Sequence, residues 1–330
     1  MKKYPLLLLV AFLVAFTACN EPQQRIARSV GATSEILVVL QNPQQWQGAE
    51  GEAIRAFFGQ DQAGLTQSEP LFRLSNINVD NLSDMFKKHR NMLVVEINSK
   101  LKEAVVETRS DLWAKPQRVI KITAPDAASW IEAFDSNKEG FKLLYDRSER
   151  ERLLNIFRPT ANVKVMEPVL KAFDIKLLIP EGYYIAKSET DFMWIRKEAN
   201  DFSQALMIYA TPYLDTTDLN PHKVISRRDF LVQQYIPGPV QGSFMSTDKE
   251  FMPPLVKNTT HFVTDFAVET RGVWNVVGDF MAGPFVSYTV IHPKSGQLIT
   301  IEGYVYAPNK PKRDHLRQLE AIIYSLEFQQ

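Results

Sequence analysis

The chain has 330 residues, of which 45% are hydrophobic and 23% are charged, the balance of an ordinary globular protein. Its 38 basic and 38 acidic residues leave no formal net charge, so no basic excess indicates nucleic-acid binding. With a single cysteine, it cannot form an internal disulfide or a thiolate zinc site.

The first residues predict an exported protein with a lipid anchor. Two lysines precede an apolar stretch that ends at Phe16 and is shorter than the roughly 20 residues of a membrane-spanning helix. The sequence FTAC at 16–19 resembles the lipobox of bacterial lipoproteins. This resemblance implies a signal peptide over 1–18, cleavage before Cys19, and acylation of its thiol and amino group. Two or more acyl chains hold a protein stably on a membrane; the alternative is a free thiol.

The next part of the chain predicts a tether and a mixed α/β domain. Residues 19–33 are polar and lack periodicity, as a flexible tether would be. Over 34–158 we expect strands and helices packed in layers, with one helix after Asn42-Pro43 that ends at Gly59 and a long one over 126–158 that breaks at Gly140. The expected strands lie at 35–40, 71–79, 92–97, 103–107 and 117–123, and a short helix at 82–90.

Residues 159–330 predict an antiparallel sheet flanked by helices. A short helix near 166–173 precedes four strand-like segments, and a helix begins at Asn220-Pro221. Three further strands lead to a last helix that we expect to start at Asn309. The seven strands lie at 175–180, 183–187, 191–198, 203–211, 261–277, 284–292 and 297–306. The fold class is therefore α+β: a mixed α/β domain followed by an antiparallel-sheet domain.

Several segments resemble a known lipoprotein family. They are EILVVL at 35–40 with Trp46, His89-Arg90-Asn91, GPFVSY at 283–288, EGYVYAP at 302–308 and RQLEAIIYSL at 317–326. These segments, spread over the mature chain, resemble the family of domain of unknown function 4837. The resemblance implies a lipoprotein of the Gram-negative envelope with no assigned activity. The element order and the last helix of the second half are also similar to PsbP/Mog1-type folds, which are binding and assembly proteins.

No local motif predicts catalysis, a metal or a cofactor. The five histidines are at least 23 residues apart, so no zinc motif is present. Carboxylates that act as acid and base can come from distant strands, so a hydrolase acting on glycan or peptide is the alternative to a binding module. Two buried carboxylates in one cleft would favour the hydrolase.

Three groups of residues are candidates for a ligand or partner surface. Residues 237–262 are rich in proline and glycine, predict no regular structure and carry Phe244, Phe251 and Met252, which either fold back on the body or contact a partner. An aromatic group beside an arginine either lines one cleft or belongs to the core: Arg271, Trp274, Phe285 and Tyr288. Arg90 and Asn91 at a helix–strand junction favour a capping and ion-pair role, with a binding site as the alternative.

Together these observations predict a lipid-anchored protein of the cell envelope that binds or assembles a partner without catalysis. We expect the membrane, through the lipid, and an envelope protein as partners, and no nucleic acid. The sequence Asn20-Glu21-Pro22 lacks a dense acidic run, which favours the outer membrane facing the periplasm over the cell surface.

Overall fold

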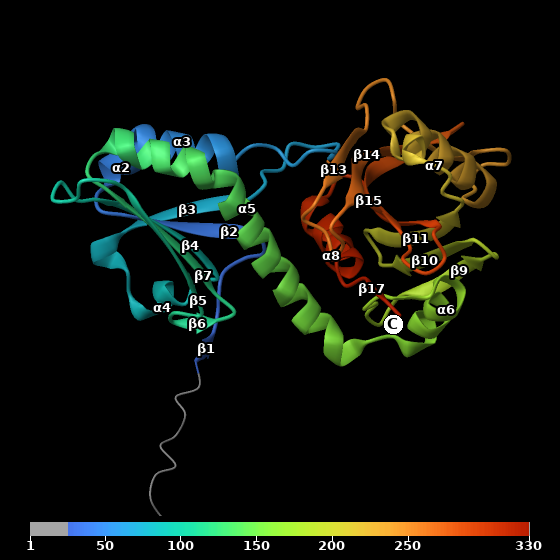
Figure 1. Cartoon of the computed structure of the whole chain (residues 1–330), viewed down its shortest axis with the longest axis horizontal. Coiled ribbons are helices and arrows are strands. Elements are labelled where there is room, and N and C mark those ends of the chain that lie inside the picture. Colours follow the sequence, from blue (N-terminus) through green and yellow to red (C-terminus); the bar gives the residue numbers. More distant parts are fainter. Residues whose placement is uncertain (1–25, 330) are drawn as a thin grey trace, which may run out of the picture.

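The computed structural model describes residues 26–329, which form two domains connected by one long helix (Figure 1). The N-terminal domain contains a five-stranded sheet in the order β3-β2-β4-β7-β5. β2 runs parallel to β3 and β4, β4 runs parallel to β7, and β5 closes the edge antiparallel to β7. The strands are β2 (Glu35–Leu40), β3 (Arg73–Asn78), β4 (Asn91–Ile97), β5 (Val105–Ser110) and β7 (Arg118–Ala124). The expected mixed sheet is confirmed.

The two faces of this sheet are covered unequally. Three helices pack on one face around an aromatic core of Phe58, Phe72, Phe134 and Tyr145, whose rings meet edge to face. These helices are α2 (Pro43–Gln47), α3 (Ala49–Phe58) and the first half of α5 (Ala127–Phe157). On the other face, the 3₁₀ turn η2 (Val79–Asn81) leads into the four-residue α4 (Asp84–Lys87), next to a small cluster around Leu37 and Met92.

Two details of the N-terminal helices differ from the prediction. Asn42 Oδ1 accepts a hydrogen bond from Gln45 N at 3.2 Å and caps α2, but the predicted single helix is interrupted at Gly48. The prediction of a break at Gly140 is wrong, because α5 is one continuous helix of 31 residues that includes Gly140. A glycine inside a helix costs only about 1 kcal/mol relative to alanine, and packing along α5 offsets that cost.

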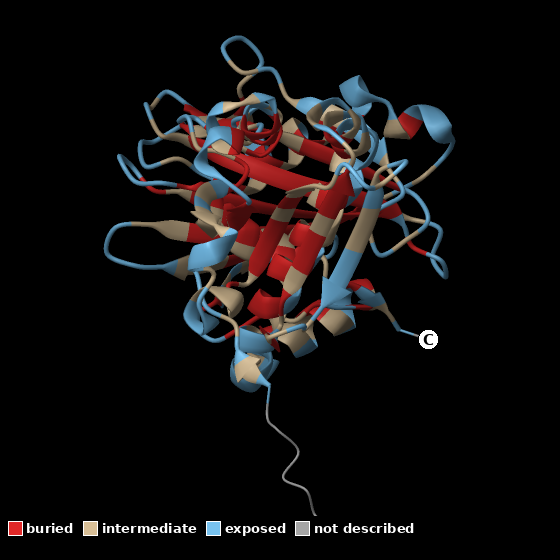
Figure 2. Cartoon of the chain, turned by 90° about the vertical axis from the view of Figure 1, so that its left-hand side faces the viewer, coloured by how far each residue is buried: buried red, intermediate tan, exposed pale blue. Residues whose placement is uncertain are grey.

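The C-terminal domain is built on an antiparallel sheet, as predicted, but the sheet has eight strands and does not include the strand expected at 175–180. Helices α6 (Val163–Phe173) and α8 (Arg313–Ile323) pack on one face, and α7 (Pro221–Tyr235) packs on the other. Figure 2 shows that buried residues concentrate in the sheets and exposed residues in the surrounding loops. The strands, in spatial order, are β12 (Phe244–Thr247), β14 (Ala267–Val277), β15 (Ala282–Ile291), β16 (Leu298–Tyr306), β11 (Ser203–Thr211), β10 (Phe192–Glu198) and β9 (Tyr184–Ser188), with β13 (Leu255–Thr259) beside β14.

Short elements complete the two domains. β8 (Ile175–Lys176) lies outside the large sheet and pairs with β17 (Glu327–Phe328) near the end of the chain. The 3₁₀ turns η3 (Arg158–Thr160) and η4 (Thr216–Leu219) precede α6 and α7. The last helix starts at Arg313 rather than at Asn309, whose positive φ of 58° is incompatible with a helix.

The tether expected over 19–33 is shorter than the sequence indicated. β1 (Ala27–Arg28) pairs in parallel with β6 (Ala114–Lys115), and Val30 N donates to Lys88 O at 2.9 Å. Backbone hydrogen bonds therefore hold residues 27–30 on the edge of the domain, although their sequence has no apolar pattern that predicts this. Cys19 lies outside the described residues, and no helix within 26–329 is long and apolar enough to cross a membrane.

Candidate functional site

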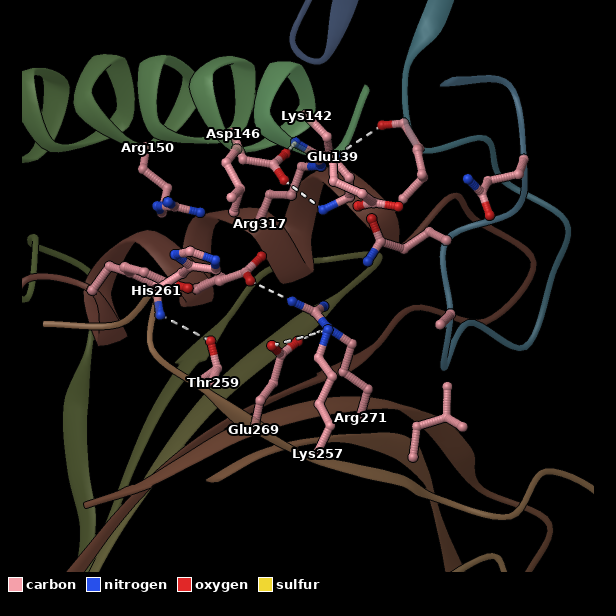
Figure 3. A pocket seen from close by; sticks show the side chains of 18 of the residues that line it. Glu139, Lys142, Asp146, Arg150, Lys257, Thr259, His261, Glu269, Arg271 and Arg317 are labelled. Atoms are coloured by element: carbon pink, nitrogen blue, oxygen red, sulfur yellow. Dashed lines mark hydrogen bonds and ion pairs between the residues drawn. The ribbon is translucent and has the colours of Figure 1, made fainter. Parts of the chain in front are cut away.

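A cavity of about 290 Å³ lies between the two domains (Figure 3). Its upper wall in this view is α5, and its lower wall is formed by β13 and β14, with α8 behind. Charged groups from both domains face it: Asp61, Glu139, Lys142, Asp146, Arg150, Lys257, Glu269, Arg271, Arg317 and Glu320. The cavity is therefore strongly charged but nearly balanced in sign.

Helix α5 supplies four of these charges, and three of them lie in one row. Lys142, Asp146 and Arg150 are four residues apart, so they follow one another along the same side of the helix. Asp146 accepts from Lys142 Nζ at 2.8 Å and from Arg317 Nη1 of α8 at 3.0 Å. Burial alone would raise the pKa of Asp146, but the nearby cations Lys142, Arg317 and Arg150 outweigh it and hold that pKa well below 3.8.

The sheet supplies a second chain of charges. Glu269 and Arg271 are two residues apart on β14 and therefore point to the same face. Arg271 Nε donates to Glu269 Oε1 at 2.5 Å, and its Nη2 donates to Glu320 of α8. The Tyr288 hydroxyl donates to Glu320 at 3.1 Å. Burial opposes ionisation of Glu320, but Arg271 and Arg150 lower its pKa below the usual 4.5.

These carboxylates are poor candidates for acid catalysis. The cavity does gather several of them, which is the arrangement a hydrolase would need. A general acid, however, requires a raised pKa so that it holds a proton near neutral pH. Asp146 and Glu320 are shifted in the opposite direction, since each is paired with an arginine. Asp146 and Glu320 are therefore fixed charges rather than proton donors.

Arg150 differs from the other cations at the site. Its guanidinium lies 3.8 Å from the centre of the Tyr324 ring, a cation–π contact. Within residues 26–329, no carboxylate oxygen lies within 4.0 Å of this guanidinium, although every other arginine and lysine facing the cavity has such a partner. Burial raises the pKa of Tyr324 to about 12, so its hydroxyl stays protonated. Arg150 is therefore held in place by Tyr324, and its guanidinium N–H groups have no carboxylate partner within residues 26–329.

Arg150 also belongs to a wider depression that we call the α5 groove. It has a volume of about 1010 Å³ and runs along α5 between β5 and the loop at 261–263. Its charged lining contains three arginines against one glutamate: Arg147, Arg150, Arg158 and Glu151. His261, Phe262 and Tyr324 form the facing wall. The α5 groove thus combines positive charge with aromatic surface.

The sequence-predicted aromatic cleft does not exist as one site. Arg271 and Tyr288 line the cavity, whereas Trp274 and Phe285 lie on the opposite face of the sheet, in the cluster beneath α7. Side chains three positions apart on a strand point to opposite faces, so Arg271 and Trp274 cannot line one cleft. Trp274 and Phe285 are core residues, the alternative that the sequence left open.

Arg90 and Asn91 lie in a buried polar network away from the cavity and the α5 groove. Glu149 of α5 accepts from Asn91 Nδ2 at 2.7 Å, from Arg90 Nη1 at 3.0 Å and from Arg152 Nη1 at 2.6 Å. The network connects β4 to α5. These contacts fit the ion-pair role that the sequence favoured.

The segment 237–262 contains two strands that the sequence did not predict. β12 and β13 both pair with β14, so the expectation of no regular structure is wrong. Phe251 lies between them and is 89% exposed, while Phe244 and Met252 are partly buried. None of the three lines the cavity or the α5 groove. Whether they contact a partner stays a prediction.

The sequence reading missed the residues of α5 that form the site. The segment 146–158 has the mixed charge that is typical of a solvated helix face. The sequence feature that could have indicated the site is the four-residue spacing of Lys142, Asp146 and Arg150. Among residues 26–329, no group of three or more His, Cys, Asp or Glu side chains could hold a metal ion.

Two protein-family models match the chain. Residues 162–325 match the model described as Domain of unknown function (DUF4837). The C-terminal domain belongs to this family. Residues 29–158 match a different model, Domain of unknown function (DUF8532), so the DUF4837 match is confined to the C-terminal domain, whereas the resemblance was expected over the whole mature chain.

The solved structures that match the chain cover about half of it. The Ran-binding protein Mog1p of Saccharomyces cerevisiae is 8% identical with a TM-score of 0.30, covering 47% of this chain and 90% of its own. LpqN, involved in cell envelope biogenesis of Mycobacterium tuberculosis, is 16% identical with a TM-score of 0.25, covering 45% of this chain and 79% of its own. No curated protein matches the sequence. At these scores, the similarities carry no conclusion about function.

Proposed function

We propose that this protein is a lipid-anchored component of the cell envelope that binds an anionic group of a partner protein in the α5 groove, without catalysis. The observation that carries the proposal is the position of Arg150. Its guanidinium is held against Tyr324 and has no carboxylate partner within residues 26–329, although the other arginines and lysines that line the cavity are paired.

An arginine in this state suits recognition of carboxylate or phosphate. The planar guanidinium can donate two parallel hydrogen bonds to such a group, and stacking on a ring fixes its orientation beforehand. Arg147 and Arg158 add positive charge along the same helix, and His261 and Phe262 supply the opposite wall. This positive charge would attract an acidic segment of a partner into the α5 groove.

The anchor is the second part of the proposal. The apolar N-terminus and the FTAC sequence support acylation of Cys19. The lack of a dense acidic run at Asn20-Glu21-Pro22 supports a place on the outer membrane facing the periplasm. Replacement of Cys19 by serine should leave a precursor without acyl chains. Intact-mass measurement of the membrane-extracted protein checks this expectation, and an unmodified thiol at Cys19 would contradict it.

A hydrolase is the second candidate, because the cavity gathers Asp146, Glu269 and Glu320. It is disfavoured because arginines hold the pKa of Asp146 and Glu320 low. Retention of partner binding in an Asp146→Asn variant that still folds would agree with binding alone.

The binding site can be tested by crosslinking in intact cells. A photo-crosslinking amino acid replaces Glu151, which lines the α5 groove. We expect one discrete crosslinked product that is lost in the Arg150→Gln variant. The control is Arg55→Gln, because Arg55 also lies over an aromatic ring, 4.8 Å from the centre of Trp46, but lines neither the cavity nor the α5 groove.

The anionic chemistry is tested separately with citrate as the probe. Calorimetric titration of the purified protein should show binding that weakens at least tenfold in Arg150→Gln and is unchanged in Arg55→Gln. Equal binding by both variants, or a crosslinked product that survives in Arg150→Gln, would show that the α5 groove is not the site.

A further inference from the structure

We infer that the N-terminal domain rests on the lipid bilayer through one defined surface, formed where β1, α4 and β6 meet. We call it the basal surface. Figure 1 shows these three elements together at the lower edge of the domain, where the described chain begins. The inference rests on the proposed lipid anchor and adds to it a second, direct contact between protein and membrane.

The basal surface collects exposed apolar side chains from three segments. Its members are Ile26, Val30, Met85 and Leu112, which are 55%, 46%, 65% and 45% exposed. The segments are held together by backbone pairing: β1 pairs with β6, and Val30 N donates to Lys88 O at 2.9 Å. Clustering of exposed apolar side chains, unlike single ones, marks an interaction surface.

The apolar material continues inward from this surface. Leu82, Phe86 and Trp113 are only partly buried, and they pack against Leu37 and Met92 on the second face of the sheet. Within residues 26–329, the helical cover on that face is only η2 and the four-residue α4. The aromatic side chains Phe86 and Trp113 therefore lie just behind the exposed residues, as in proteins whose aromatic rings sit at the level of lipid headgroups.

The charges around the surface suit anionic lipid headgroups. The segments 26–30, 84–89 and 111–116 carry four basic residues and two acidic ones: Arg28, Lys87, Lys88, Lys115, Asp84 and Asp111. Asp84 pairs with Lys87 at 3.0 Å and Asp111 with Lys115 at 3.9 Å, which leaves Arg28 and Lys88 in excess. Long basic side chains can lay their methylene groups on apolar surface and extend their charge toward phosphate.

The short distance between Cys19 and residue 26 indicates that the basal surface contacts the bilayer rather than a partner protein. Cys19 precedes Ile26 by seven residues, a span of at most about 25 Å when fully extended. Because residues 26–30 are held on the domain, an acylated Cys19 keeps the basal surface within that distance of the membrane. A free partner protein would have to enter the same narrow space.

The absence of other cysteines allows a direct test on the full lipidated chain. Cys19 is the only cysteine, so its acylation leaves a single introduced thiol for labelling. An environment-sensitive nitrobenzoxadiazole dye is attached in the variants Met85→Cys and Leu112→Cys. The matched control is Leu214→Cys, a residue that is 83% exposed on the C-terminal domain. Each protein is reconstituted in vesicles of phosphatidylethanolamine and phosphatidylglycerol.

On vesicles, we expect the dye at 85 and 112 to emit at shorter wavelength and to be less quenched by iodide. The reference is the same labelled protein in detergent-free solution, after removal of its acyl chains. The dye at 214 should remain quenched in both conditions. A dye at 85 and 112 that stays quenched on vesicles, in protein whose acylation is verified by mass, would overturn the inference while leaving the anchor intact. Failure of acylation itself would be seen as double labelling, at Cys19 as well.

Discussion

Arg317 of α8 donates from Nη1 to Asp146 of α5 at 3.0 Å and so connects the two domains through an ion pair that is mostly removed from water. Its Nη2 also donates to the backbone oxygen of Leu71 at 2.8 Å. One guanidinium thus holds the long helix and the loop that leads into β3 against the C-terminal domain. The position of this pair, at the back of the cavity, makes the shape of the candidate site depend on it.

Replacing Arg317 should therefore destabilise the protein strongly. In Arg317→Met, Asp146 keeps Lys142 but loses its partner across the interface, and the free energy of unfolding should fall by about 3–5 kcal/mol. Urea unfolding measures this change. The matched control is Arg73→Met, whose pair with Asp314 also crosses the interface at 2.6 Å but is 50% and 33% exposed. Its loss should cost about 0–1 kcal/mol, and equal effects of the two variants would contradict this ranking.

The interface should also weaken in acid. Asp146 and Glu320 have folded-state pKa values below their ordinary 3.8 and 4.5, so the folded protein binds fewer protons than the unfolded chain as pH falls through this range. Their contribution to stability is fully present above about pH 5 and is lost progressively below it. Denaturant unfolding between pH 7 and pH 3 should show this decline. It should be smaller in Arg317→Met, in which one of the causes of the shift is absent.

The two strands in 237–262 lead to a contrast between neighbouring apolar residues. Met245 of β12 is 3% exposed and packs in the cluster beneath α7, so Met245→Ser should lower the free energy of unfolding by about 2–5 kcal/mol. Phe251 is 89% exposed, and Phe251→Ser should change it by less than about 0.5 kcal/mol. Thermal unfolding of the two variants checks the prediction. A large loss in Phe251→Ser would mean that its ring packs on the body.

A buried pair on the other face of the sheet should behave as a unit. Arg228 of α7 donates from Nε and Nη2 to Glu302 of β16 at 2.8 and 2.7 Å, and both side chains are almost fully buried. Glu302→Gln removes the buried counter-charge and leaves the guanidinium only the more distant Asp229 Oδ1 at 3.8 Å, which should cost about 3–5 kcal/mol.

The double variant Arg228→Met with Glu302→Leu removes both charges and should recover most of that loss. Denaturant unfolding of the single and double variants provides the comparison. A double variant that is less stable than Glu302→Gln would show that the pair is net stabilising.

Two helix starts that depend on residues close together in the sequence were predicted correctly, and two strands that depend on a partner strand were not. Asn42 and Asn220 cap helices that begin with proline, and their side chains bond within three residues, so the motif is visible in the sequence. β12 and β13 were missed because their pairing partner is β14, which follows in the chain, and their own residues are largely polar or exposed. Their strand structure comes from a free edge of β14 and not from their own pattern.

The candidate site was hidden for a similar reason. A row of charged residues on a helix has the same sequence pattern whether it faces water or another domain. Only the packing of α8 on α5 brings Arg317 to Asp146 and Tyr324 to Arg150, residues more than 170 positions apart. The aromatic residues of β14 and β15 were noticed, but the alternation along a strand separated them onto two faces.

The pairing of β8 with β17 brings the C-terminal residues beside the strand that follows α6, near the start of the C-terminal domain, since Ile175 meets Phe328 and Lys176 meets Glu327. A unit whose entry and exit points coincide can be cut from one chain and spliced into another with little disturbance to either. The separate family matches of residues 29–158 and 162–325 fall on either side of this unit's start. A ladder of two residue pairs thus gives the C-terminal domain the neighbouring entry and exit points that insertion into another chain requires.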